Sequence, residues 1–511
     1  MILNDIKLNI DEDLEVLKFK VLKQLKLSPS DLKTFKLIKK SVDARDKNDI
    51  HFVCSVAVNE LAYERIIPQK IKSSVRPIVC GFGPAGMFAA LYLSLAGLKP
   101  IVLERGDKVE IRKGKVDDFW KTGNLDLNTN VQFGEGGAGT FSDGKLTTGI
   151  NNPLCNEVIK IFIENGAPCD IEYLGKPHIG TDNLSKIVKN IRETILALDG
   201  EIFFNAKLSD IEIKNNGINK IISKKDTYNS PILVLATGHS ARDTYKMLFD
   251  KNIIMQQKIF SVGFRIEHRQ NFIDKAQYGK FAGHKNLPAA EYKFSYHDNN
   301  DNNAYTFCMC PGGFVVASSS FKNTVVTNGM SAYDRNGENA NSAVLVNVDQ
   351  KYFKSFHPLA GIDFQETLEE KAFIMAGSNY SAPCQLFGDF LNNCQSNSLG
   401  EIKPTYTPSV SFCNLNELFS ERINKTLKTA VKFFGNKLKG FDDENAILTA
   451  PETRSSSPVK ILRDNGTLQS NIKGLYPCGE GSGYSGGIMS SAVDGLKVAL
   501  KIIEDIKSGQ Y

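Results

Sequence analysis

The sequence predicts an α/β fold built around a mostly parallel sheet, and three observations lead to this prediction. A short apolar strand at residues 77–80 runs into a glycine-rich loop at 81–86 and then into an apolar helix at 87–96. A second apolar strand, residues 100–103, ends in Glu104, placed to accept hydrogen bonds from ribose hydroxyls. This order of strand, glycine loop, helix, strand and acid is typical of a Rossmann-like dinucleotide-binding unit.

Each glycine of the loop has a separate structural role. Gly81 allows a sharp turn out of the strand, Gly83 allows backbone amides to approach a pyrophosphate, and Gly86 allows the helix to pack against the sheet. Pro84 and Ala85 lie between them, at a helix N-terminus whose partial positive charge favours a bound phosphate. We therefore expect all five residues to contribute to a nucleotide site.

Composition and charge exclude several classes of protein. The chain has 511 residues, which at roughly 100 to 200 residues per domain allows two to four domains. Hydrophobic residues make up 41% and charged residues 23%, as in an ordinary folded protein rather than a disordered, collagen-like or coiled-coil one. The net charge of +5 is too small to indicate a polyanionic partner, so no nucleic-acid partner is expected from it.

The sequence also gives expectations about location and metal content. No apolar run approaches the ~18 residues that a membrane helix needs, and residues 1–13 are acidic where a signal peptide would be basic and apolar. We therefore expect no membrane span and a cytoplasmic protein. The ten cysteines form no CxxC pair and the seven histidines lack HxH or HxxxH spacing, so we expect neither a disulfide framework nor a bound metal.

Longer motifs make the prediction more specific. Ala90 follows Gly86 by four residues and Gly97 follows Ala90 by seven, which is similar to the FAD-binding variant of the Rossmann fingerprint. Five further motifs resemble segments of the bacterial family of uncharacterised FAD-dependent dehydrogenases; they lie at residues 130–145, 236–243, 305–313, 451–458 and 474–489. The resemblance covers nearly the whole chain and implies a glutathione-reductase-like fold with FAD as its cofactor.

The resemblance implies that segments far apart in the sequence hold the FAD. The glycine-rich stretch after residue 130 offers backbone amides, hydroxyls and a cation to the pyrophosphate or ribityl chain. The acidic residue of the C-terminal motif is placed to bind the ribityl hydroxyls, and the helix after it to stabilise negative charge on the reduced flavin. Beyond residues 81–86 and Glu104, the implied contacts are Arg105, Arg112, Gly136, Gly137, Gly139, Thr140, Ser142, Lys145, Leu208, Thr237, Gly238, Gly479, Glu480, Gly486, Gly487 and Ile488.

We expect the chain to be organised into four segments. Residues 1–70 form a small N-terminal α+β domain, and residues 76–250 the first part of the FAD-binding domain. Residues 251–445 are too long for a loop and form an inserted β-rich substrate domain, with strands at its apolar runs and a helix at 415–434. Residues 446–511 return to the FAD-binding domain.

The N-terminal segment is basic and allows two interpretations. Ten basic and three acidic residues lie between residues 18 and 47, among them Lys33, Lys36, Lys39 and Lys40. This surface could bind RNA or could be a solvated face. We favour the solvated face, because no aromatic residues alternate with the lysines as a stacking platform requires.

The sequence offers three candidates for substrate chemistry. His178 lies in an irregular turn before a helix, where it is either an acid-base group or a structural residue. Glu452 and Arg454 precede the C-terminal flavin motif and either meet the substrate or pair with each other. Cys308 and Cys310 share one face of an expected strand; a redox pair is conceivable, but buried, inert thiols are the favoured interpretation.

Together these features predict an FAD-dependent oxidoreductase that exchanges a hydride between a small-molecule substrate or NAD(P)H and N5 of the flavin. Because no second GxGxxG follows a strand and opens a helix, NAD(P)H is expected only as a transient donor. Two alternatives stay open: a flavin monooxygenase, and a non-catalytic or RNA-associated FAD-binding protein that uses the basic N-terminal segment. The oligomeric state and the substrate are left open.

Overall fold

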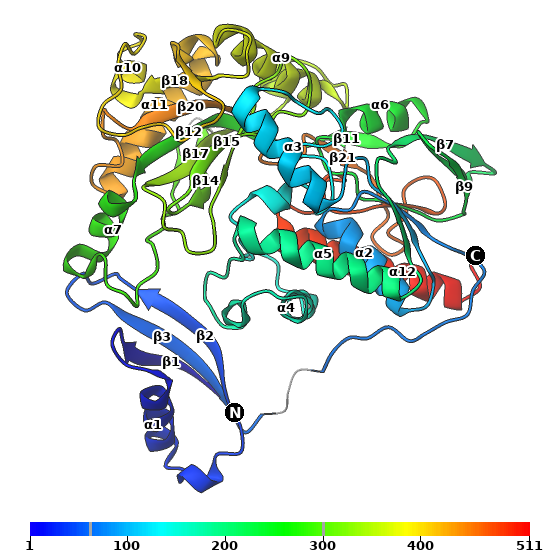
Figure 1. Cartoon of the computed structure of the whole chain (residues 1–511), viewed down its shortest axis with the longest axis horizontal. Coiled ribbons are helices and arrows are strands. Elements are labelled where there is room, and N and C mark those ends of the chain that lie inside the picture. The colour runs from blue at the N-terminus through cyan, green and yellow to red at the C-terminus, as the bar shows by residue number, and fades with distance from the viewer. Residues whose placement is uncertain (61–63, 299–301) are drawn as a thin grey trace.

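A five-stranded parallel sheet lies at the centre of one large unit of the molecule (Figure 1). The computed structural model describes residues 1–60, 64–298 and 302–511. The predicted α/β fold with a parallel sheet is confirmed, and two predicted apolar strands form neighbours in it. The strands in spatial order are β22 (Leu475–Pro477), β10 (Leu233–Leu235), β4 (Ile78–Cys80), β5 (Ile101–Leu103) and β6 (Glu201–Phe203).

Alternate residues of these strands serve two separate cores, because successive side chains point to opposite faces of a sheet. Val79 and Val234 pack against a helical layer, whereas Leu233 and Leu235 pack against the other side. The helical layer consists of α2 (Pro84–Leu95), α4 (Leu154–Glu164), α5 (Thr181–Ala197) and α12 (Ile488–Lys507). The other side is covered by α6 (Arg242–Asp250) and by the antiparallel strands β7 (Leu208–Lys214), β8 (Gly217–Ser223) and β9 (Thr227–Asn229).

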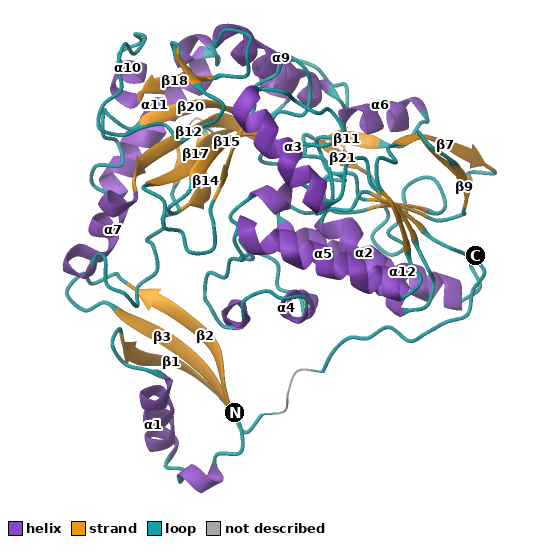
Figure 2. Cartoon of the chain, in the orientation of Figure 1, coloured by secondary structure: helices purple, strands orange, loops and turns teal. Residues whose placement is uncertain are grey.

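A second, larger sheet forms the β-rich unit that the sequence predicts between residues 251 and 445 (Figure 2). It is mixed but mostly antiparallel. Its seven strands in spatial order are β13 (Ser295–His297), β14 (Asn303–Cys310), β17 (Asn339–Val348), β12 (Phe260–Arg269), β20 (Ile447–Glu452), β18 (Ala382–Leu386) and β19 (Val410–Phe412). Helices and short strand pairs complete the unit: α7 (Gln270–Tyr278), α8 (Gln350–Phe353), α9 (Ala360–Met375), α10 (Phe387–Leu391), α11 (Glu421–Lys437), β15 (Phe314–Ala317) with β16 (Thr327–Met330), and β11 (Met255–Gln257) with β21 (Val459–Ile461).

Two sequence predictions for this unit need correction. The predicted boundary at residue 445 falls before the last strand of the sheet, since β20 pairs with both β12 and β18. The predicted helix 415–434 is a short 3-10 turn followed by α11, which begins at residue 421. The interruption has a local cause, because Ser420 caps α11 by accepting a hydrogen bond from the backbone N–H of Ile423.

The N-terminal unit has the predicted order of strand, helix and hairpin. Strands β1 (Ile2–Asn9), β2 (Phe35–Asp43) and β3 (His51–Val58) form an antiparallel sheet with β3 in the middle. Helix α1 (Leu14–Leu25) begins where Asp13 accepts a hydrogen bond from Val16, as the run of acids before it indicates. Residues 61–63 of the predicted domain 1–70 lie outside the described residues.

The basic face of this unit is partly used in contacts with the rest of the chain. The edge of β2 pairs with residues 173–175, because Lys40 and Tyr173 share a backbone hydrogen bond of 2.7 Å. The Lys36 ammonium lies 2.7 Å from the Glu172 carboxylate, and the Lys40 ammonium lies 4.0 Å above the Phe52 ring. Two of the four lysines considered for RNA binding are therefore engaged within the chain.

The structure also bears on the expectations about membranes, metals and cysteines. In this part of the chain, no helix combines the length and the apolarity that crossing a membrane requires. Across the same residues, no three His, Cys, Asp or Glu side chains converge as a metal site would need. All ten cysteines are free thiols.

Candidate functional site

A cavity of about 730 Å³ lies between the parallel sheet and the larger mixed sheet. This size is within the range of about 300–1,000 Å³ that is usual for small-molecule and cofactor sites. One wall consists of the segments that follow β4, β5, β10 and β22 at their carboxyl ends. The other includes part of β14 and the end of β20. Ligands of open parallel sheets bind at this edge, so the cavity is the candidate site.

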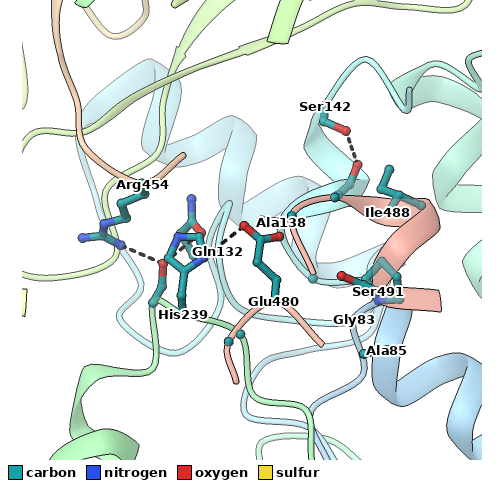
Figure 3. Close-up of a pocket in the computed structure, with 18 of the residues that line it drawn as sticks. Gly83, Ala85, Gln132, Ala138, Ser142, His239, Arg454, Glu480, Ile488 and Ser491 are labelled. Carbon is teal, nitrogen blue, oxygen red and sulfur yellow. Dashed lines mark hydrogen bonds and ion pairs between the residues drawn. The ribbon is translucent and has the colours of Figure 1, made fainter. Parts of the chain in front are cut away.

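Two helix N-termini open into this cavity (Figure 3). Helix α2 begins after Gly83 and α12 begins after Gly487. Within the described residues, no side chain caps the first turn of either helix. Each end therefore presents unpaired backbone N–H groups and a partial positive charge to the cavity, as an anion site requires.

The glycines of the first loop are required by close backbone approaches. Gly81 has a φ of +95°, and a Cβ there would lie 2.3 Å from the Ala236 carbonyl oxygen. A Cβ at Gly86 would lie 1.9 Å from the Gly81 carbonyl oxygen, so Gly86 lies behind the cavity wall and lets α2 start against the sheet. Gly81, Gly83, Pro84 and Ala85 line the cavity.

The second glycine-rich segment contributes only some of its predicted residues to the lining. Gly137, Gly139, Ser142 and Lys145 line the cavity. The structure corrects the prediction for two others: Gly136 and Thr140 lie behind the wall, where a Cβ on Gly136 would lie 2.2 Å from the Thr140 hydroxyl oxygen. They shape the loop instead of facing a ligand.

Lys145 is the cation of this segment, and its ammonium group bridges the two walls. It donates a hydrogen bond to the Met309 carbonyl oxygen of β14. It also lies 3.6 Å from the carboxylates of both Asp143 and Glu291. Although burial opposes its charge, these carboxylates raise the pKa of Lys145, so it stays charged at neutral pH.

Arg112 does not have the predicted role of reaching a phosphate. It lies on α3 (Val109–Thr122) and is fully buried behind the loop. Its guanidinium donates hydrogen bonds to the backbone carbonyls of Asn130, Val131, Gly134 and Glu135 at 2.6–3.2 Å. Arg112 therefore positions the glycine-rich segment. It can do so only because the loop folds back over α3 and buries the Arg112 side chain.

We expect Arg112→Lys to lower the free energy of unfolding by about 1–3 kcal/mol, because one ammonium cannot serve four carbonyls in this fork geometry. The measurement is urea unfolding followed by circular dichroism. Lys113→Arg, on the exposed face of the same helix, is the matched control and should change stability by less than about 0.5 kcal/mol. Equal stability of the two variants would contradict the positioning role.

The acid at the end of β5 has its predicted place but is already hydrogen-bonded. Glu104 lines the cavity, and its carboxylate accepts hydrogen bonds from the backbone N–H groups of Phe82, Gly106 and Gly134 at 2.8–3.0 Å. It thus ties both glycine-rich segments together and keeps acceptor capacity for a further donor. Arg105 also lines the cavity and pairs with Asp243 at 2.6 Å. Leu208 contributes to the same wall.

The C-terminal motif and the turn after β10 meet inside the cavity. Thr237, Gly238, Glu480, Gly486, Gly487 and Ile488 all line it, and their contact with FAD stays a prediction. Gly479 lies behind the wall, where a Cβ would lie 2.6 Å from the Ala85 Cβ. Its predicted contact with a ligand is therefore corrected to a close packing of the β22 end against α2.

His239 is a residue of the site that the sequence analysis missed. It follows the Thr237-Gly238 turn, and its Nδ1 lies 3.4 Å from Glu480 Oε1 (Figure 3). Its Nε2 is buried and has no hydrogen-bond partner among the described residues. Its position directly after the carboxyl end of a parallel strand is the signal that could have found it.

His178 is not placed for acid-base catalysis, contrary to one of the two interpretations. Its Nε2 lies 2.9 Å from the Tyr333 carbonyl oxygen, and its ring stacks on the Tyr333 ring at 5.2 Å between centroids. Burial lowers the pKa of His178, so the ring is neutral at physiological pH. The ring lies behind the wall, while Lys176 and Pro177 before it line the cavity.

Glu452 and Arg454 both line the cavity but do not pair with each other. Glu452 accepts hydrogen bonds of 2.9 and 3.1 Å from Arg265. Burial raises the pKa of Glu452 to about 7, although Arg265 acts in the opposite direction. Arg454 pairs with Glu369 at 2.8 Å and also contacts the hydroxyls of Ser240 and Ser320.

The chain matches protein families in two regions. Residues 259–455 match the family model described as FAD-dependent protein, C-terminal domain-like, and residues 1–59 match a domain of unknown function, DUF8436. A protein of Clostridium beijerinckii described as an uncharacterized protein is 47% identical over 524 residues, which cover 98% of each chain. The chain belongs to the same family as this clostridial protein.

The similar solved structures have low TM-scores and low sequence identity. Halogenase PltM matches with a TM-score of 0.40 and 10% identity, over 86% of this chain and 71% of that one. A geranylgeranyl bacteriochlorophyll reductase-like protein of Thermoplasma acidophilum gives 0.38 and 14%, over 86% and 80%. Glycine oxidase from Bacillus cereus gives 0.31 and 10%, over 86% and 96%. These values are too low to support a functional assignment.

Proposed function

We propose that this chain binds FAD in the cavity and acts as an oxidoreductase that exchanges a hydride between a small-molecule substrate or NAD(P)H and N5 of the flavin. The observation that carries the proposal is the pair of uncapped N-termini, of α2 and α12, in one cavity. Two such ends offer N–H groups and positive charge at two places, as a dinucleotide flavin requires. The family match at residues 259–455 supports the same cofactor.

The residues of the parallel-sheet wall fit this cofactor. The amides after Gly83 would hold the pyrophosphate, and Glu104 would accept from the ribose hydroxyls. The Glu480 carboxylate, whose polar contact is with His239, is free to accept from the ribityl hydroxyls. When bound, FAD supplies a two-electron acceptor. The N-terminus of α12 at Ile488 would stabilise the negative charge that reduction adds there.

The opposite wall would bind the substrate. Glu452 has a pKa near neutrality and lines the cavity, so it can hold or release the proton that accompanies hydride transfer. Arg454 and Lys145 present cations at the same wall, although both are paired with carboxylates. We infer that Glu452 is the acid-base group and that Arg454 orients a polar or anionic part of the substrate.

Anaerobic stopped-flow absorbance at the oxidised flavin band tests the function. The FAD-loaded protein is mixed separately with NADH and with NADPH, and dithionite serves as the control for a reducible flavin. Rapid bleaching by either nucleotide identifies the donor. Bleaching by dithionite alone removes NAD(P)H from the proposal and leaves an organic substrate as the donor. A purified protein that fails to retain or bind FAD would contradict the proposal itself.

Glu480→Ala is expected to weaken FAD binding by about tenfold, the value of one hydrogen bond to a charged acceptor. The fold should be unaffected, because the Glu480 side chain is 27% exposed and, within the described part of the chain, its one ion pair is with His239. The measurement is quenching of flavin fluorescence on titration of the FAD-free protein. Unchanged affinity would remove Glu480 from the site.

Glu452 should make stability depend on pH in a defined direction. Its pKa of about 7 in the folded chain lies above the ordinary 4.5, so the folded state binds the extra proton. The stabilisation is complete below about pH 4.5 and is lost as the pH rises through 7. Glu452→Gln should therefore flatten the fall of the unfolding free energy between pH 5 and 8, as measured by urea unfolding. Exposed Glu401→Gln is the control, and identical slopes in all three proteins would refute the assignment.

A further inference from the structure

A bulge in β14 brings Cys308 to the cavity. Phe307 is paired with Ala343 and Cys310 with Asn341, so β14 has one residue more than β17 between these pairs. Cys308 adopts a φ of +43°, a left-handed conformation that is strained for a residue other than glycine. Strict alternation along a regular strand predicts two equivalent, buried thiols, and the bulge overturns this expectation. Cys308 lines the cavity, whereas Cys310 is fully buried behind it.

The Cys310 thiol is directed back towards Cys308 behind this bulge. It donates a hydrogen bond to the Cys308 carbonyl oxygen at 3.2 Å. Arg265 lies beneath both residues: its Nη2 donates to the Cys308 carbonyl at 2.6 Å and lies 3.9 Å from Cys310 Sγ. The ammonium of Lys145 binds the carbonyl of Met309 between them.

The charges around the pair favour one thiolate and one thiol. The neighbouring thiol of Cys310, together with Arg265 and Lys145, lowers the pKa of Cys308 to about 6 despite its burial and the nearby carboxylate of Asp143. The nearness of Cys308 and burial raise the pKa of Cys310. A charged Cys308 also raises the pKa of the Glu452 carboxyl. A thiolate beside a protonated thiol is the arrangement from which a disulfide forms most readily.

We propose that Cys308 and Cys310 are a redox-active dithiol that exchanges two electrons with the flavin of the same cavity. In the forward direction the Cys308 thiolate joins the Cys310 sulfur, so that the Cys310 S–H bond breaks and one S–S bond forms. The two electrons and the one proton released by the sulfurs are taken up by the oxidised flavin, which becomes the anionic, fully reduced flavin. The flavin half of this exchange rests on the proposed function, whereas disulfide formation is a property of the chain alone.

The first test uses the full-length, FAD-free protein. After treatment with diamide and blocking with N-ethylmaleimide, tryptic peptide 294–322 is analysed by mass spectrometry; its two cysteines are Cys308 and Cys310. We expect a peptide lighter by two hydrogens than the reduced peptide and without a maleimide adduct. Cys308→Ser and Cys310→Ser should each give one maleimide adduct. Cys169→Ser, at an exposed cysteine, should behave like the wild type.

The second test uses the FAD-loaded protein with its thiols reduced, under anaerobic conditions and without an added donor. The flavin band should bleach in the wild type and in Cys169→Ser but persist in Cys310→Ser. A wild-type peptide that carries two maleimide adducts after diamide overturns the dithiol. Disulfide formation without any flavin bleaching overturns the electron exchange. Failure to bind FAD contradicts the proposed function and leaves the first test as a separate result.

Discussion

Gly83→Asp is expected to abolish FAD binding, with a loss of at least about 100-fold in affinity, or about 2.7 kcal/mol. The added carboxylate would lie at the uncapped N-terminus of α2 and occupy the place of the pyrophosphate with the same sign of charge. The fold should remain intact, because Gly83 has a φ of −78° and its added Cβ would be in ordinary contact with Gly137, 3.7 Å from Cα and 4.0 Å from the backbone N. An aspartate at the N-cap even stabilises a helix.

This prediction separates ligand binding from folding. Flavin content after purification and titration of the FAD-free variant measure binding, while thermal unfolding without FAD measures stability, which should be equal to or above that of the wild type. Gly83→Asn adds a side chain of the same size without the charge, and Gly83→Ala adds only the Cβ. Both should bind FAD more tightly than Gly83→Asp. A yellow Gly83→Asp protein with full flavin content would disprove the site.

Glu369→Ala is expected to destabilise the protein by about 3–5 kcal/mol, the cost of leaving buried charges without their partner. Glu369 lies fully buried on α9 and accepts hydrogen bonds from Arg242 at 2.8–2.9 Å and from Arg454 at 2.8–3.0 Å. Thr453 donates a further bond of 2.7 Å. Without this carboxylate, two arginines are left in a buried position, and Arg454 loses the contact that fixes it at the cavity.

Burial alone raises the pKa of Glu369, but Arg242 and Arg454 outweigh burial and lower it to about 2. Its stabilisation is therefore complete above the ordinary carboxyl pKa of 4.5 and is lost as the pH falls towards 2. Glu366→Ala is the matched control, because Glu366 lies on the same helix but is 30% exposed and 3.6 Å from Arg242. Urea unfolding should show a change of less than about 1 kcal/mol for Glu366→Ala. Equal losses in both variants would contradict the buried cluster.

The first glycine-rich loop could be predicted from the sequence because its interactions are local. Gly86 packs against the carbonyl oxygen of Gly81, five residues before it. The Glu104 carboxylate accepts a hydrogen bond from the backbone N–H of Phe82, 22 residues before it. A short segment of this kind is specified by glycine spacing and apolar pattern, which the sequence displays directly. The same holds for α1 and its N-cap Asp13.

The partners of the charged residues at the cavity could not be predicted, because these partners are distant in the sequence. Glu452 binds Arg265, 187 positions away, and Arg454 binds Glu369, 85 positions away, whereas a pairing of neighbours was the simple alternative. Arg112 could not be distinguished from a phosphate ligand, because its four carbonyl partners become neighbours only when the loop closes over α3. The contact between His239 and Glu480 likewise joins two segments that are distant in the sequence and adjacent only in the folded chain.

The sequence by itself determined the parallel α/β fold, the glycine loop and the helix that follows it, because periodicity and glycine spacing are local properties. The tertiary structure alone decided which charged residues face the cavity, since each is selected by a partner from another element. It also decided the role of the two cysteines. A single extra residue in β14 turns Cys308 towards the cavity, and whether a bulge forms depends on the pairing with β17 rather than on β14 alone.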